Sequence, residues 1–341
     1  MRRILVTGGA GFIGSNFVHY MLRTHQDIEI VNLDKLTYAG NLENLTAVEK
    51  DSRYTFVQGD IADQKLVADI LSSKKFDSIV NFAAETHVDR SITRPEEFLN
   101  TDIFGTFALL EGACKNHVDR YLQISTDEVY GSIPKGNSAA EVSQLKPSSP
   151  YSASKGGGDL LTLAYYTTYQ LPTMITRAAN NYGPYQYPEK FIPLFITNAI
   201  DDMPLPLYGD GSQIREWLYV DDHCSAIDLV LHKGEPGEIY NVGGYTEEEN
   251  RVIANKILDL LNKPKDLIQF VQDRPGHDTR YSVDDSKLRS LGWEPKVDVE
   301  NGLDRTVRWY VDHPEWWRRL KGSEYKEYYK QQYGKRLTPT T

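Results

Sequence analysis

The sequence predicts an α/β protein with a doubly wound parallel sheet, because short β-branched segments alternate with amphipathic helical segments over its first half. Between the first two β-branched segments, Ile13, Phe17 and Met21 recur at every fourth position, which is typical of a helix with one apolar face. Several strand candidates are almost wholly apolar, as strands covered on both faces are. The expected strands are Ile4–Thr7, Ile28–Leu33, Tyr54–Gln58, Ser78–Phe82, Tyr121–Ser125 and Thr173–Arg177.

The second half of the chain has a different sequence pattern, because prolines and aromatic residues become frequent after about residue 180. It predicts a smaller C-terminal α/β lobe, so that residues 1–180 form one lobe and 181–341 the other, with some exchange of strands and helices between them. The aromatic tail from Trp316 to Tyr333 is expected to pack on its own lobe, with a partner surface as the alternative. The helices expected in this half are Phe191–Ile200, Asp222–His232, Arg251–Leu261 and Val299–Asp312.

Composition excludes several classes of protein. With 38 basic and 48 acidic residues the formal charge is −10, which argues against duplex nucleic acid as the main partner. No run approaches the ~18 apolar residues of a membrane span. Two cysteines, Cys114 and Cys224, predict neither a disulfide framework nor a metal site, and they suit a reducing compartment. We therefore expect a cytoplasmic protein without a metal.

A glycine-rich turn follows the first strand directly and opens the first helix. It contains Gly8, Gly11 and Gly14. Because glycine has no side chain, a pyrophosphate can approach the backbone closely at the positive end of the helix. Asp34 ends the second strand, 20 residues after Gly14, where a carboxylate binds a ribose 2′-hydroxyl and repels a 2′-phosphate. This pattern predicts a Rossmann-type site for NAD rather than NADP. Asp60 and Ile61, which close the third strand, are placed to flank the adenine.

Tyr151 and Lys155 begin a helix after Pro150 and stand four residues apart, so their side chains share one helix face. An ammonium close to a phenol favours the phenolate and should lower the pKa of Tyr151. Tyr151 is therefore a candidate acid–base group, and Lys155 could also hold a ribose. Such a spacing alone is common on solvated helices, but here it follows a nucleotide-binding turn.

With these motifs the chain resembles the dTDP-glucose 4,6-dehydratases, a nucleotide-sugar branch of the extended short-chain dehydrogenase/reductase superfamily. The resemblance covers nearly the whole length and is carried by six ordered segments: Ala83–Ser91, Ser125–Gly131, Asn180–Gln186, Glu189–Lys190, Tyr208–Arg215 and Asp273–Asp278. It implies that a nucleoside-diphosphate glucose is dehydrated to a 4-keto-6-deoxy sugar with NAD as cofactor, a first step toward deoxysugars such as rhamnose. It also implies a homodimer, formed through helices around Phe98–Cys114 and Tyr151–Tyr169.

The resemblance also implies roles for individual residues. Tyr151 takes the proton of the sugar 4-hydroxyl, with Lys155 beside it, and Thr126 hydrogen-bonds the developing carbonyl. Glu128 removes the C5 proton as base, and Asp127 protonates the departing 6-hydroxyl as acid. The implied cofactor contacts are Gly8, Gly11, Phe12, Ile13, Gly14, Asp34, Lys35, Leu36, Thr37, Asp60, Ile61, Phe82, Ala83, Ala84, Thr86, Thr101, Tyr151, Lys155 and Asn180. The implied substrate contacts are Thr86, Thr126, Asp127, Glu128, Asn181, Lys190, Phe191, Pro206, Leu207, Tyr208, Arg215, Asn250, Asp273, Arg274 and His277.

Two alternatives stay open. The first is a nucleotide-sugar 4-epimerase or decarboxylase on the same scaffold, and the adjacent carboxyls Asp127 and Glu128 argue against it because an epimerase eliminates no water. The second is a non-catalytic NAD-binding protein, against which the intact acid–base set argues. Three consecutive glycines, Gly156–Gly158, lie inside the predicted Tyr151 helix and cost about 1 kcal/mol each relative to Ala. They indicate either close backbone packing or a mobile helix start.

Overall fold

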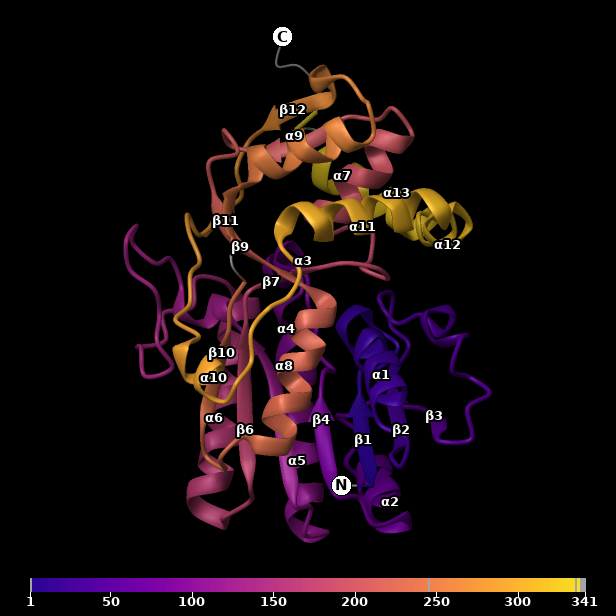
Figure 1. The fold of residues 1–341 in the computed structure, drawn as a ribbon, viewed down its shortest axis with the longest axis vertical. Helices are drawn as coiled ribbons and strands as arrows, with labels where there is room; N and C mark the ends of the chain where they lie inside the picture. Colours follow the sequence, from indigo (N-terminus) through magenta and orange to yellow (C-terminus); the bar gives the residue numbers. More distant parts are fainter. Residues whose placement is uncertain (1, 245, 335, 338–341) are drawn as a thin grey trace.

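The computed structural model describes residues 2–244, 246–334 and 336–337, and its centre is a seven-stranded, wholly parallel sheet (Figure 1). The strand order is β10-β6-β5-β4-β1-β2-β3, so the chain runs outward in one direction from β1 and returns to the other side of it at β4. The carboxyl ends of β1 and β4 therefore form a topological switch point, where open α/β sheets bind their ligands. The strands are β1 (Arg3–Thr7), β2 (Glu29–Asp34), β3 (Tyr54–Gln58), β4 (Ser78–Asn81), β5 (Arg120–Thr126), β6 (Thr173–Ala178) and β10 (Ile239–Val242).

All six predicted strands are present, and the predicted fold class is confirmed. The seventh strand, β10, was not predicted, because it is only four residues long and lies within the proline-rich half of the chain. It pairs with β6, which means that the large sheet takes its edge strand from beyond residue 180.

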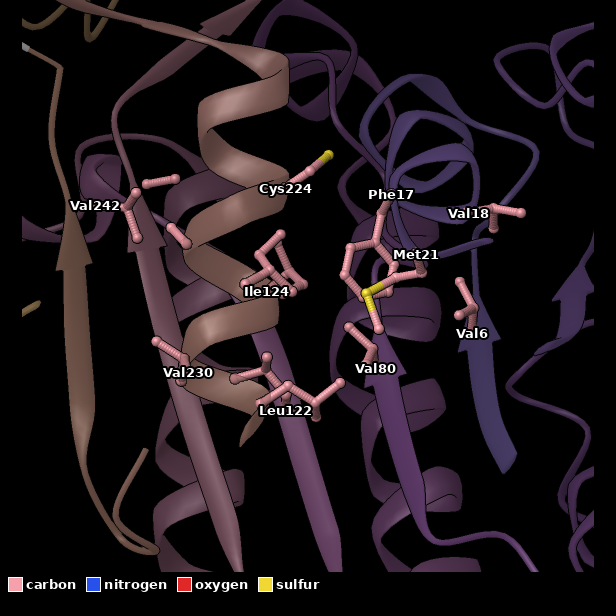
Figure 2. Packing of buried hydrophobic residues seen from close by; sticks show 14 of the residues in the cluster. Val6, Phe17, Val18, Met21, Val80, Leu122, Ile124, Cys224, Val230 and Val242 are labelled. Atoms are coloured by element: carbon pink, nitrogen blue, oxygen red, sulfur yellow. The ribbon is translucent and has the colours of Figure 1, made fainter. Parts of the chain in front are cut away.

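Helices cover both faces of this sheet. One face carries α1 (Phe12–Thr24) and α8 (Val220–Lys233), whose apolar side chains meet those of β1, β4 and β5, with Cys224 buried among them (Figure 2). The other face carries α2 (Gln64–Ser73), α5 (Thr106–Lys115) and α6 (Pro150–Tyr169). None of the helices in the described part of the chain combines the length and the apolar character that a membrane-spanning helix needs.

The second lobe is built on two small sheets above the carboxyl edge of the large one (Figure 1). Its core joins α7 (Phe191–Ile200), α9 (Asn250–Leu260) and α11 (Val299–Asp312) to the aromatic tail, in which Trp317 is wholly buried and Tyr325 and Tyr333 nearly so. The tail thus packs on its own lobe, as expected. Its strands are β7 (Asn180–Tyr182), β8 (Leu205–Tyr208), β9 (Ile214–Tyr219), β11 (Thr246–Glu249) and β12 (Ile268–Val271). The remaining helices are α3 (Val88–Thr93), α4 (Pro95–Phe98), α10 (Ser286–Ser290), α12 (Pro314–Leu320) and α13 (Ser323–Tyr333).

Two of the three consecutive glycines of α6, Gly157 and Gly158, face a wide helical turn, the π-helix of residues Leu99–Gly105. A Cβ atom on Gly158 would lie 3.0 Å from the backbone oxygen of Asp102, and one on Gly157 would lie 2.9 Å from a methyl of Ile103. At Gly156 the nearest atom would be 3.7 Å away. Close packing therefore accounts for Gly157 and Gly158, whereas Gly156 is not sterically required.

This difference predicts that alanine has different effects on stability at positions 156 and 158. Gly156→Ala should stabilise the protein by up to about 1 kcal/mol, because alanine is the better helix former and the added methyl meets no close neighbour. Gly158→Ala should gain less or lose stability, because its methyl presses on a backbone carbonyl. Urea unfolding of the two variants measures the comparison, and an equal gain at both positions would contradict the packing argument.

Candidate active site

The glycine turn after β1 is built for close approach of backbone to a ligand. Gly8 has a positive φ of +69°, and a Cβ there would lie 2.6 Å from the amide nitrogen of Ala83. A Cβ on Gly14 would lie 2.3 Å from the carbonyl oxygen of Gly8. Gly11 caps α1, so the first amides of that helix face the space above the turn. The turn thus leaves bare backbone open to a pyrophosphate, the group that its glycines predict as a ligand.

Asp34 lies at the carboxyl end of β2 and orders the loops around it. Its carboxylate accepts the amide N–H of Ala10 at 2.9 Å and that of Leu36 at 2.8 Å, which leaves further lone pairs for a ribose hydroxyl. Neighbouring Lys35 is paired with Asp60 at 2.7 Å. Because the charge of Lys35 is already neutralised by Asp60, Lys35 does not offset the repulsion between Asp34 and a 2′-phosphate.

A cavity runs from this turn along the carboxyl edge of the sheet, and the predicted cofactor contacts line it with one exception. Leu36 does not line the cavity and packs toward the apolar core instead. The buried Oδ1 atom of Asn180 has no hydrogen-bond partner among the described residues, although it stands at the cavity wall. The residues that do line it are Gly8, Gly11, Phe12, Ile13, Gly14, Asp34, Lys35, Thr37, Asp60, Ile61, Phe82, Ala83, Ala84, Thr86, Thr101, Tyr151, Lys155 and Asn180.

The acid–base residues of β5 are positioned by the turn that ends the strand. Thr126 caps the 3₁₀ helix Asp127–Tyr130, because its hydroxyl oxygen accepts the N–H of Glu128 at 3.2 Å. The same hydroxyl donates to Asp127 Oδ1 at 3.2 Å. Gly131, with a φ of +71°, ends the short helix. Two carboxyls and one hydroxyl are thereby fixed at the carboxyl end of β5, beside the central strand β4.

Helix α6 brings Tyr151 and Lys155 to the same strand. Ser149 and Ser152 form a capping box at its start, and Pro150 occupies the first turn. Lys155 Nζ donates to the carbonyl oxygen of Ile124 on β5 at 2.7 Å. The register of the helix against the sheet is therefore held by the same lysine that the sequence marked as functional.

The pKa of Tyr151 differs from the sequence-based expectation. Burial, together with the carboxylates of Glu128 and Asp102, raises the pKa of this phenol well above its ordinary value. A hydrogen bond with Thr126 acts in the opposite direction and is outweighed. The predicted lowering was wrong for this arrangement, because the carboxylates and the burial were invisible in the Tyr-x-x-x-Lys spacing.

Asp127 and Glu128 have unequal surroundings. Burial raises the pKa of Asp127 well above its usual range, and the charges of Glu128 and Glu216 raise it further. Burial also raises the pKa of Glu128, but the cations Arg274, Arg215 and Lys190 oppose this effect. The environment therefore favours a protonated Asp127 beside an ionisable Glu128, as an acid and a base acting on one molecule require.

A second cavity opens between the two lobes and shares part of its wall with the first. Glu128, Asn180, Asn181 and Lys190 line both, so the two cavities meet at Glu128, one of the acid–base residues. Of the predicted substrate contacts, Thr86 and Thr126 line only the first cavity. Those that line the second are Glu128, Asn181, Lys190, Phe191, Pro206, Leu207, Tyr208, Arg215, Asn250, Arg274 and His277.

Two predicted substrate contacts line neither cavity. Asp273 accepts a hydrogen bond from Gln213 and lies 2.6 Å from His277 Nδ1. It therefore orients the imidazole of His277, which does line the second cavity. Asp127 is buried beneath the surface of the cleft, and its Oδ2 atom has no hydrogen-bond partner among the described residues.

Three cations surround the second cavity. Arg215 donates to the carbonyl oxygens of Ile214 and Asp278, and its guanidinium lies 4.3 Å from the ring centre of Tyr281. Arg274 is held through Nε by Asp89 at 3.4 Å, and its buried Nη1 has no hydrogen-bond partner among the described residues. Lys190 donates to the carbonyl oxygen of Thr86. Such a group suits a diphosphate.

Several cleft residues were missed from the sequence. The Tyr281 hydroxyl donates to Asp278 at 2.8 Å and to Glu128 at 3.4 Å, and this tyrosine follows the quoted Asp273–Asp278 segment by three residues. Asp89 lies within another quoted segment. Tyr333 comes from α13 and lines the second cavity, but no motif in the tail marks it.

The fold and the site together define a dinucleotide-dependent enzyme of the short-chain dehydrogenase/reductase class that acts on a phosphorylated ligand. Residues 5–306 match the family model described as GDP-mannose 4,6 dehydratase. The chain belongs to the dTDP-glucose 4,6-dehydratase family. It is 50% identical over 327 residues to the enzyme of that name from Streptomyces niveus, covering 94% of this chain and 96% of the relative.

Solved structures agree with this membership. The dTDP-glucose 4,6-dehydratase of Streptomyces venezuelae, solved with NAD bound, superposes with a TM-score of 0.91 at 52% identity, covering 94% of this chain and all of that one. A UDP-glucose 4-epimerase from Thermus thermophilus, in complex with NAD, reaches 0.85 at 31% identity over 91% of this chain and 99% of that one. The fold is thus shared by dehydratases and epimerases.

Proposed function

We propose that this protein dehydrates dTDP-glucose to its 4-keto-6-deoxy product and water, with NAD as the cofactor. The observation that carries the proposal is the carboxyl pair Asp127–Glu128. Glu128 lines both cavities, and Asp127 is buried next to it beneath the surface of the cleft. The relatives of the same name support the substrate, and the glycine turn with Asp34 supports the cofactor. NAD, when bound, accepts a hydride from the sugar C4 and returns it to C6.

The first step falls to Tyr151 and Thr126. To receive the proton of the sugar 4-hydroxyl as C4 is oxidised, Tyr151 has to act as the phenolate. The positive charges of Lys155 and of a bound oxidised nicotinamide would oppose the rise in its pKa that burial and the carboxylates cause. The Thr126 hydroxyl hydrogen-bonds the carbonyl oxygen that forms. Lys155 lies on the same face of α6 as Tyr151, so its ammonium is close to the phenol. Its bond to the Ile124 carbonyl keeps this face against β5.

The elimination falls to the two carboxyls. The C4 ketone acidifies the C5 proton, which the carboxylate of Glu128 removes. Asp127, protonated because it is buried beside two further carboxyls, gives its proton to the 6-hydroxyl, and water leaves. Glu128 returns its proton to C5. The proton that Tyr151 took from the 4-hydroxyl then has to pass to Asp127, directly or through water, before the cleft residues regain the protonation states in which they began.

An epimerase is the runner-up, and the fold does not separate the two activities, because an epimerase structure superposes well. The carboxyl pair does separate them, since epimerisation eliminates no water and needs neither acid nor base at C5 and C6. A decarboxylase on this scaffold and a non-catalytic NAD-binding protein use no such pair either, so these readings are less well supported.

Substitution of the acid–base residues tests the mechanism. Tyr151→Phe should lower kcat by about 10²–10⁴-fold and stop the first oxidation, because the proton of the 4-hydroxyl has no acceptor. Asp127→Asn and Glu128→Gln should slow elimination and still show the ultraviolet absorbance of reduced nicotinamide in a single turnover. Full turnover in either carboxamide variant would contradict the assignment.

A panel of thymidine, uridine, cytidine and guanosine diphosphate glucoses tests the substrate. Product is followed by the alkaline absorbance of 4-keto-6-deoxy sugars, and we expect the thymidine compound to react with the highest kcat/KM. Conversion of a substrate to its C4 epimer without loss of water would favour the runner-up instead.

Arg215 offers a test of diphosphate binding. Arg215→Gln should raise KM for the nucleotide sugar by about ten- to hundredfold, the value of one lost charge-assisted hydrogen bond, with a smaller change in kcat. Arg318→Gln is a matched control, because Arg318 lies at the surface in a pair with Asp201. An unchanged KM in Arg215→Gln would remove this residue from the binding site.

We further propose that residues 1–180 and 181–341 form two domains, with α8 and β10 of the second packed into the first. We also propose a cytoplasmic protein, because the free thiols Cys114 and Cys224 suit a reducing compartment.

We propose in addition that the protein is a homodimer. Exposed apolar side chains cluster on α6 and on the helical segments packed beside it, and a second copy would bury them. They are Ile92 (43% exposed), Leu99 (50%), Phe104 (61%) and Leu160 (60%).

Leu160→Glu tests the dimer, because a charge in a self-complementary apolar face opposes itself across the two-fold axis. Sedimentation velocity should show the wild type as a dimer and this variant as a monomer. Phe270→Glu, on β12 in the other lobe and equally exposed, should leave the dimer intact. A dimeric Leu160→Glu variant would place the interface elsewhere.

A further inference from the structure

A cluster of two histidines and one aspartate lies at the end of the large lobe opposite to the active site. His25 follows the last turn of α1, while Asp228 and His232 stand four residues apart on α8. His25 Nε2 lies 3.0 Å and 3.1 Å from the two carboxylate oxygens of Asp228, and His232 Nδ1 lies 2.9 Å from one of them. The two imidazoles stack at 5.2 Å with Asp228 between their nitrogens. The proposed reaction uses none of these groups.

The surroundings of the cluster favour a cation. Helices α1 and α8 pack on each other, and both end here, at Thr24 and Lys233. The C-terminal end of a helix carries a partial negative charge, and two such ends meet beside the Asp228 carboxylate. The backbone near His25 is also fixed, because its carbonyl oxygen accepts from Arg53 at 2.7 Å.

We propose that His25, Asp228 and His232 bind a transition-metal dication of the Zn²⁺ type, with water completing the coordination. Two imidazole nitrogens and one carboxylate oxygen form a donor set that such ions prefer, whereas Mg²⁺ and Ca²⁺ prefer oxygen alone. The ion would clamp α1 to α8 and thereby stabilise the large lobe. It would not take part in the reaction of the cleft.

The geometry needs only small adjustments. The three donor atoms lie within 4.8 Å of one another, and donors at 2.0–2.1 Å from a tetrahedral ion stand roughly 3.3 Å apart. The imidazoles therefore have to approach each other by less than about 1.5 Å. The ion replaces the protons that His25 Nε2 and His232 Nδ1 share with the oxygens of Asp228, and each proton moves to the other nitrogen of its ring or, from a charged imidazole, to solvent.

Titration of the metal-free protein with ZnCl₂ tests the site. We expect one equivalent to bind with a micromolar or lower Kd, to raise Tm, and to be replaceable by Co²⁺ with the visible d–d absorption of a low-coordinate site. His25→Gln and His232→Gln should each weaken binding by at least an order of magnitude and leave kcat unchanged. His313→Gln is the matched control, because His313 also follows the last turn of a helix and should bind no metal.

Two outcomes would overturn the proposal. One is the absence of zinc binding at micromolar concentrations in the wild type. The other is zinc binding that His25→Gln and His232→Gln leave unchanged, which would place the ion at another site. Circular dichroism and turnover of each variant establish that it is folded, and Asp228→Asn, which keeps the shape and removes the charge, provides a further variant whose affinity must fall.

Discussion

The cleft depends on the burial of two adjacent carboxyls at the carboxyl end of strand β5, beside the central strand β4 of the large sheet. Placing Asp127 and Glu128 away from water is costly, and the protein limits this cost unequally. The carboxyls of Glu128 and Glu216 favour the neutral form of Asp127, whereas Glu128 faces Arg274, Arg215 and Lys190, which favour its charged form. One strand end therefore holds an acid and a base side by side at neutral pH.

The same cations join the chemistry to ligand binding. They oppose the protonation of Glu128, and they line the cavity in which a diphosphate would lie. A bound diphosphate would compete for their charge, and Glu128 would then be a stronger base with the substrate in place than without it. Tyr281 lies under the Arg215 guanidinium and donates to Glu128. It therefore connects a cation that lines the ligand cavity to the carboxyl that acts as the base.

Much of the fold and most of the cleft could be predicted, because the signals are local. Strand β3 (Tyr54–Gln58) and helix α7 (Phe191–Ile200) have the predicted bounds, and Gly14 and Asp34 lie where a dinucleotide turn requires them. What the sequence could not give depends on tertiary contact. The pKa of Tyr151 is set by burial and by distant carboxylates, Tyr333 reaches the cleft from the far end of the chain, and β10 crosses between the lobes.

The two lobes are also held together around the cleft by a half-buried cation, Arg90. The guanidinium of Arg90 lies 3.7 Å from the ring centre of Tyr38, in the loop after β2, and 4.5 Å from that of Tyr328 on α13. It pairs at 3.2 Å with Glu189, whose side chain is 1% exposed and which precedes Lys190. The side chain of Arg90 therefore contacts the loop after β2, the second lobe and the aromatic tail. A reaction that returns its hydride needs no exchange of cofactor between turnovers, and a dinucleotide enclosed behind this junction would be retained through all of them.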